Sequence, residues 1–113
     1  MDISVIGKHV DLGQALRNHV ELHLVDAVGK YFNKPLDAQV IFSREAHEYR
    51  AEITVHAARG IKLQAHAEAA DAYAAFDSAL IKAAKRLRRQ KRKIRDHRKK
   101  DDSDRTSAEN RDE

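Results

Sequence analysis

The stretch that decides the fold is "EYRAEITVHAARGIKLQAHAE", residues 48–68. It holds two runs, 48–58 and 61–68, in which apolar residues alternate with polar ones, and Arg59 and Gly60 separate them. Such alternation puts apolar side chains on one face of a strand, which indicates a sheet covered on one side only. Gly60 can adopt the positive φ that a tight hairpin needs. The stretch therefore predicts an antiparallel hairpin with one buried face.

Two further strands are expected on the N-terminal side of this hairpin. "LDAQVIFSRE" at 36–45 alternates in the same way and is joined to the hairpin by a short turn at 46–47. The three strands from 36 to 68 should therefore form an antiparallel meander. "DISVI" at 2–6 is short and β-branched, which is typical of a strand.

Two helices complete the pattern. Between residues 11 and 32 apolar residues recur at helical spacing, with Asp11 or Gly13 as candidate caps and "NKP" at 33–35 as the end. A second helix is predicted from about 71 to 95. The residues expected on its apolar stripe are Tyr73, Phe76, Leu80, Ala83, Ala84 and Leu87.

The order of these elements is β-α-β-β-β-α, which predicts an α+β fold. We expect a two-layer sandwich, with a four-stranded sheet and two helices on one of its faces. The 113 residues fit a single small domain, placed at 1–95. Residues 96–113 have no apolar period and are predicted to be a disordered charged tail or the start of a linker.

Charge is distributed unevenly along the chain. Residues 71–95 carry nine Lys or Arg and two Asp or Glu, a net charge of +7. Residues 1–70 and 96–113 have net charges of −1 and −2, so the positive excess of the chain sits on the second helix. This localisation favours an anionic polymer or surface as the partner.

The basic residues of the second helix are the candidate binding site. No acidic residue lies between Asp77 and Asp96, although a solvated helix normally mixes both signs because like charges repel. Phosphate binding explains this best, while a merely solvated face and an acidic protein partner remain the alternatives. The predicted RNA-binding residues are Lys82, Lys85, Arg86, Arg89, Arg92 and Lys93.

The histidines give weaker signals. His19 and His23 are four residues apart and could share a metal ion, but no third ligand is evident, so ordinary half-buried packing is the prediction. His56 and His66 lie on the polar faces of neighbouring strands. They could stack on nucleic acid or simply be exposed, and the sequence does not decide between these roles.

Nothing in the sequence indicates catalysis. There is no Gly-rich phosphate loop, no G-x-S-x-G and no H-E-x-x-H, and the four glycines are scattered. We therefore expect no enzyme activity, cofactor, metal or small-molecule substrate. The absence of cysteine fits a reducing cytoplasm, and no segment is long and apolar enough to predict membrane insertion.

Several segments, in order, resemble one known family. "GKHVDLGQALRNHVE" (7–21), "KYFN" (30–33), the meander and "AHAEAADAYAAFD" (65–77) precede the Lys/Arg-rich helix. This arrangement over residues 1–95 resembles the hibernation-promoting factor family, also called ribosome-associated inhibitor A or sigma-54 modulation proteins. Its D-x-Y-A-A-[IF]-D signature is matched by Asp71, Tyr73, Ala74, Ala75, Phe76 and Asp77.

The resemblance implies a fold like that of double-stranded RNA-binding domains and a ribosomal role. Members bind the small ribosomal subunit between head and body, overlap the mRNA path and the tRNA sites, and so inhibit translation while the idle ribosome is preserved. Lys82, Lys85 and Arg89 align with the basic positions that contact rRNA, and Arg86, Arg92 and Lys93 extend that face.

Two questions stay open at this point. Long family members carry a C-terminal domain that pairs two ribosomes, so the chain is either a short form with a tail or the N-terminal domain of a longer protein. The alternative functions are a generic double-stranded RNA-binding module and an interaction protein that docks an acidic partner. The first helix disfavours the generic module, because Arg17 and Lys30 are balanced there by Glu21 and Asp26.

Overall fold

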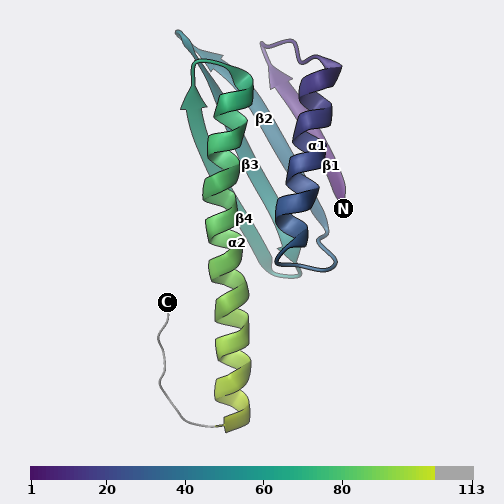
Figure 1. The fold of residues 1–113 in the computed structure, drawn as a ribbon, viewed down its shortest axis with the longest axis vertical. Coiled ribbons are helices and arrows are strands. Elements are labelled where there is room, and N and C mark those ends of the chain that lie inside the picture. The colour runs from purple at the N-terminus through teal and green to yellow at the C-terminus, as the bar shows by residue number, and fades with distance from the viewer. Residues whose placement is uncertain (104–113) are drawn as a thin grey trace.

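The elements follow the predicted order and form two layers (Figure 1). The computed structural model describes the backbone of residues 1–103 and the side-chain environments up to Ile94. The elements are β1 (Asp2–Lys8), α1 (Gln14–Gly29), β2 (Asp37–Glu45), β3 (Glu48–Ala58), β4 (Ile61–Ala69) and α2 (Ala72–Ser103). Both helices cover the same face of the sheet, which confirms the predicted α+β sandwich.

The four strands lie in the order β1-β2-β3-β4. β1 runs parallel to β2, with α1 as the crossover between them, and the other two pairings are antiparallel. The predicted meander is therefore confirmed. Among the described residues it leaves β1 and β4 as the edges of the sheet, each with one row of backbone groups that no neighbouring strand pairs.

Two tight turns connect the meander. Gly60 has a φ of +80°, as the sequence predicted, in the turn that joins Ala58 to Ile61. Ala46, between the paired residues Glu45 and Glu48, also has a positive φ of 56°. A side chain with a Cβ rarely adopts a positive φ, so this position is one that glycine usually occupies. The alanine at 46 gave no signal of it in the sequence.

The core lies between the sheet and the two helices and contains no buried polar or charged residue within the described part of the chain. α1 contributes Leu16, Val20, Leu24 and Val28, one every fourth residue, so a single face of this helix is buried. Gly13 is its N-cap and makes no side-chain cap bond, so the alternative cap at Asp11 is not used.

α2 packs closely over β4 and β3 because small side chains face each other there. The fully or almost fully buried residues of this layer include Ala75, Ala79 and Ala83 on the helix and Ala51, Ala65 and Ala67 on the strands. Phe76 and Leu87 fill the remaining space, and the Phe76 ring lies 6.5 Å from that of Phe42.

The apolar stripe of α2 differs in part from the predicted one. Phe76, Ala83 and Leu87 are buried as expected, but Tyr73 is 41% exposed, and Leu80 and Ala84 are only partly buried. The buried stripe instead runs through Ala75 and Ala79. The reason is that the helix approaches the sheet through its alanines, which turns Tyr73 toward α1, where its ring meets that of His19.

α2 continues eight residues beyond the predicted end near residue 95. An established helix needs only one hydrogen bond for each added residue and no apolar stripe, which is why periodicity did not find this extension. The predicted tail therefore begins as helical backbone, and its residues 104–113 lie outside the described part. No helix within residues 1–103 has the length and hydropathy needed to span a bilayer.

The core position of Phe76 gives a stability prediction. Phe76→Ala should lower the free energy of unfolding by about 3–5 kcal/mol, because it leaves a cavity beneath α2. Tyr73→Ala, three residues away, should cost less, about 1 kcal/mol, because Tyr73 is 41% exposed and lies outside the buried stripe. Urea unfolding of both variants measures the difference. Equal losses would mean that the helix is rotated from the orientation described.

Candidate nucleic-acid interface

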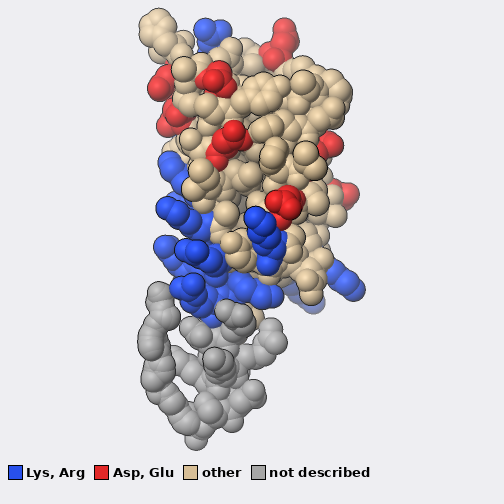
Figure 2. Space-filling model, viewed as in Figure 1, with Lys and Arg blue, Asp and Glu red and all other residues tan. Residues whose placement is uncertain are grey.

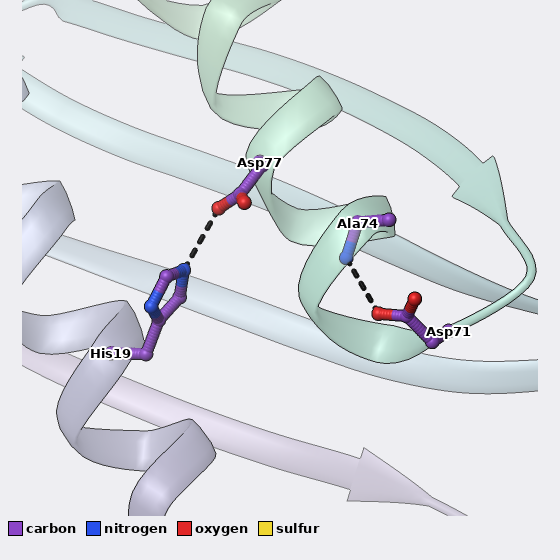
Figure 3. A network of polar contacts seen from close by, with 4 residues as sticks. All are labelled: His19, Asp71, Ala74 and Asp77. Carbon is purple, nitrogen blue, oxygen red and sulfur yellow. Dashed lines mark hydrogen bonds and ion pairs between the residues drawn. The ribbon is translucent and has the colours of Figure 1, made fainter.

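The N-terminus of α2 is fixed by the first aspartate of the D-x-Y-A-A-F-D segment (Figure 3). The Asp71 carboxylate accepts a hydrogen bond from the Ala74 backbone N–H at 2.9 Å, and the Asp71 carbonyl oxygen accepts one from the Ala75 N–H at 3.0 Å. Asp71 is thus the N-cap of the helix, where it satisfies a backbone donor that has no partner within the helix. This cap fixes where α2 begins, and so helps to determine on which side of the helix each of its basic residues lies.

The second aspartate of the segment joins the two helices. Asp77 Oδ1 lies 2.8 Å from His19 Nε2 of α1, and Figure 3 shows the two side chains pointing at each other across the gap between the helices. His19 is half-buried, with its ring 5.1 Å from the Tyr73 ring and 4.3 Å from that of His23. The predicted half-buried packing is therefore confirmed for His19, whereas His23 is exposed.

Metal binding by this cluster finds no support in the geometry. Among the residues whose positions are described, no three His, Asp or Glu side chains are arranged so that they could hold a metal ion. His19 instead uses its ring nitrogen for Asp77, so the contact serves to fix α1 against α2.

Two of the predicted RNA-binding residues contact the edge of the sheet. Lys82 Nζ donates a hydrogen bond to the His66 carbonyl oxygen at 3.1 Å, and Arg86 Nη1 donates one to the Gln64 carbonyl oxygen. Both carbonyls belong to β4, which has no strand on its outer side within residues 1–103. Lys82 and Arg86 therefore cover this edge, and charged side chains at an edge also discourage pairing with another chain.

The other four predicted residues have no hydrogen bond to the sheet within the described part of the chain. Lys85, Arg89, Arg92 and Lys93 are all exposed, and no protein acceptor for them is found within the described residues. Lys85, Arg89 and Arg92 are spaced by four and three residues, so they lie in a row along one face of the helix. A rigid row of guanidinium and ammonium groups can bind successive phosphates without reading bases.

The positive surface extends beyond the residues that periodicity identified. Figure 2 shows Lys and Arg gathered at the end of the domain where the second half of α2 passes, and Asp and Glu more at the opposite end. Arg88 is exposed there too, and Lys91 lies 5.6 Å from the centre of the Phe32 ring. The β3–β4 turn, with Arg59, reaches the same end (Figure 1).

These additional residues were missed for two different reasons. Arg88 and Lys91 fall off the predicted basic face by one or two positions of the helical wheel, and Arg59 is far from α2 in the sequence. The +7 charge of residues 71–95 was the only available signal, since it already includes Arg88 and Lys91. To predict that separate segments meet at one end of a sheet, the order and direction of its strands must be known.

The open face of the sheet is more nearly neutral than α2. Arg50 pairs with Glu68 at 3.1 Å, and His56 Nδ1 lies 3.5 Å from an Asp37 oxygen. His66 is exposed beside Glu52, its partner in the β3–β4 register. Because carboxylates accompany both histidines, this face offers less attraction to phosphate than α2 does.

Comparison with known proteins gives a consistent picture. A family model described as sigma 54 modulation protein / S30EA ribosomal protein matches residues 3–95. A ribosome hibernation promotion factor of Rhizobium meliloti is 36% identical over 97 residues, covering 86% of this chain and 51% of that protein. A ribosome hibernation promoting factor of Pseudomonas putida is 33% identical, covering 82% of this chain and 89% of that protein.

Relatives of two lengths are thus similar to the chain. It spans about half of the Rhizobium protein and of a Bradyrhizobium diazoefficiens protein of the same name, 51% and 47% respectively. Among solved structures, the N-terminal domain of Thermus thermophilus Protein Y is similar, with a TM-score of 0.71 and 32% identity over 79% of this chain and 98% of that one.

The contacts at the β4 edge predict a difference between two charge-matched variants. Lys82→Ala/Arg86→Ala and Lys85→Ala/Arg89→Ala each remove two cations four residues apart, but only the first pair covers β4. We expect the first variant to have the larger weight-average mass in sedimentation experiments at high protein concentration, because its edge is free to pair with a second copy. Identical masses for the two variants would show that these contacts do not protect the edge.

Proposed function

Because the chain belongs to the sigma 54 modulation protein / S30EA ribosomal protein family, we propose that it binds the small ribosomal subunit and inhibits translation. In this proposal it occupies the channel that mRNA and tRNA use, and rRNA phosphates are its principal contacts. The observation that carries the proposal is the row of exposed cations on α2, with no acidic residue from Ser78 to Arg95. The names of the relatives, which refer to ribosome hibernation, support it.

The proposed RNA contacts come from the outward side of α2. Lys85, Arg89, Arg92 and Lys93 have no competing partner among the described residues and would bind phosphates directly. Lys82 and Arg86 belong to the same site, because an ammonium group has three donors and a guanidinium group five, so each keeps donors after bonding β4. Release of counterions from RNA supplies most of the affinity.

In this proposal the protein inhibits translation by occupying the channel of mRNA and tRNA, and no catalytic step is needed. The part of α2 up to Leu87 is held against the sheet by its buried residues and is therefore rigid, so mRNA and the protein cannot share the same channel. Pairing of two ribosomes is proposed only for a longer form that carries a further domain.

The alternative of a generic double-stranded RNA-binding module is less well supported by the contacts. Such a module binds RNA through its first helix as well as its second. In α1, the Arg17 guanidinium donates to the Val5 carbonyl oxygen at 3.0 Å, and the Lys30 ammonium lies 3.9 Å from Asp26. Both cations already contact protein oxygens and are offset by Glu21 and Asp26, so this helix presents no row of positive charge like that of α2. An acidic protein partner remains the third possibility, and nuclease treatment of the bound material would distinguish it.

The proposal predicts inhibition at ribosome stoichiometry. Translation of a reporter mRNA in a purified bacterial system should fall steadily as the protein approaches one copy per ribosome. Lys85→Ala/Arg89→Ala should inhibit much less, because two phosphate contacts are lost. Lys8→Ala/Arg44→Ala, which removes two exposed cations away from α2, is the charge-matched control and should inhibit like the wild type. Full translation at several-fold excess of the wild type would refute the proposal.

A further inference from the structure

The positive charge of α2 is not confined to the side that carries the outer row, Lys85, Arg89 and Arg92. Lys91 and Arg89 are two residues apart, which is about 200° around an α-helix, so they lie on opposite sides of it. On its side, the Lys91 ammonium lies 5.6 Å from the centre of the Phe32 ring, in the segment that joins α1 to β2. An RNA backbone along the outer row therefore leaves Lys91 on the far side of the helix.

Two further cations lie at the end of the sheet where Lys91 meets this segment. The Leu36 backbone N–H donates to the His56 carbonyl oxygen at 3.0 Å, so the segment that enters β2 runs beside the end of β3. Because β2 and β3 are antiparallel, Lys34 and Arg59 both lie beyond this end of the sheet, and both are exposed. Figure 1 shows the two connections at the same end. We call Lys34, Arg59 and Lys91 the end cluster.

The end cluster has no ion-pair partner within the described part of the chain. Two carboxylates belong to the same region, but Asp26 lies 3.9 Å from the Lys30 ammonium and Asp37 lies 3.5 Å from the His56 ring nitrogen. Figure 2 shows Lys and Arg along the whole lower end of the described surface, below α1 as well as along α2. Three like charges from three segments repel one another in the free protein, so an anionic partner that contacts all three is favoured.

We infer that the end cluster binds a second segment of rRNA backbone, separate from the segment on the outer row. This inference deepens the proposed function and rests on it. The Arg59 guanidinium has five N–H donors and each lysine ammonium has three, so the cluster can bind several phosphate oxygens at once. RNA is favoured over an acidic protein segment because the rRNA that contacts the outer row can also supply these phosphates.

Two RNA segments also explain the charge pattern of α2. A contact on one side alone would leave the side facing α1 free to carry carboxylates, which stabilise a helix beside lysine and arginine. No acidic residue occurs from Ser78 to Arg95, on either side of the helix. With RNA on both the outer row and the end cluster, a carboxylate on either side would weaken binding.

The first test removes two cations of the end cluster without changing α2. Lys34→Ala/Arg59→Ala should weaken binding to bacterial small ribosomal subunits on the order of tenfold at low salt, with the plot of log K against log salt shallower by about two. The control Lys8→Ala/Arg44→Ala removes two exposed cations at the opposite end of the sheet and should bind like the wild type. Thermal unfolding of both variants should stay close to that of the wild type, because all four side chains are exposed.

The second test identifies what lies against the end cluster. The chain has no cysteine, so a single introduced one can carry a tethered iron chelate that cleaves nearby RNA backbone. Asn33→Cys places the chelate beside Lys34, and Ser78→Cys places it about two turns before Lys85 on the same side of α2. Both positions are exposed. In complexes with small subunits, the two chelates should cleave different segments of rRNA.

The opposite results separate the inference from the proposed function. Wild-type affinity and an unchanged salt plot for Lys34→Ala/Arg59→Ala, or an equal loss in the control variant, would overturn the inference and leave the proposed function standing. Weakened binding of the double variant without rRNA cleavage from Asn33→Cys would assign the end cluster to an acidic protein instead. Identical cleavage from both positions would show that one RNA segment serves both surfaces. A wild type that does not bind small subunits would refute the proposed function, and the inference with it.

Discussion

The close packing of α2 on β3 and β4 is the contact on which the rest of the structure depends. Alanines on both sides, such as Ala79 and Ala83 on the helix and Ala65 and Ala67 on β4, allow the helix to approach the sheet closely. That approach brings Lys82 and Arg86 within reach of the carbonyls along the β4 edge. Larger side chains in this layer would lift the helix and leave the edge uncovered.

The same contact divides α2 by face. The buried stripe contains only apolar residues, so the charges of the helix up to Lys93 must lie on its flanks or its outer side. The flank next to β4 protects the sheet edge, and the outer side presents Lys85, Arg89 and Arg92 to the surroundings. Like charges along that row repel one another in the free protein. Stability therefore comes from the alanine layer, and the repulsion is relieved when an anionic partner binds.

Alternation and helical spacing were sufficient to predict the fold. The runs at 48–58 and 61–68 gave the hairpin, and Gly60 gave its turn. The alternation is contained within each strand and the glycine within the turn, so neither prediction needs contacts between distant segments. The predicted burial of Tyr73 was wrong, because the rotation of α2 about its axis depends on which side chains of β3 and β4 the helix contacts. The end of α2 at Ser103 was also missed, because helical hydrogen bonds can continue where no apolar stripe does.

The candidate site was predicted less completely than the fold. The charge count led to α2, but it could not show that Lys82 and Arg86 contact β4 while Lys85 and Arg89 do not. It also could not reveal the pairing of Asp77 with His19, which is separated from it by 58 residues. These features depend on how distant segments meet.

The most direct test of this account is the salt dependence of binding to small ribosomal subunits, compared between the wild type and Lys85→Ala/Arg89→Ala. If the outer row of α2 contacts phosphates, the plot of log K against log salt should become shallower by about two for the double variant. Its unfolding free energy should stay within about 0.5 kcal/mol of the wild type. Parallel salt plots of equal affinity would contradict the account, because they would show that this row is a solvated face.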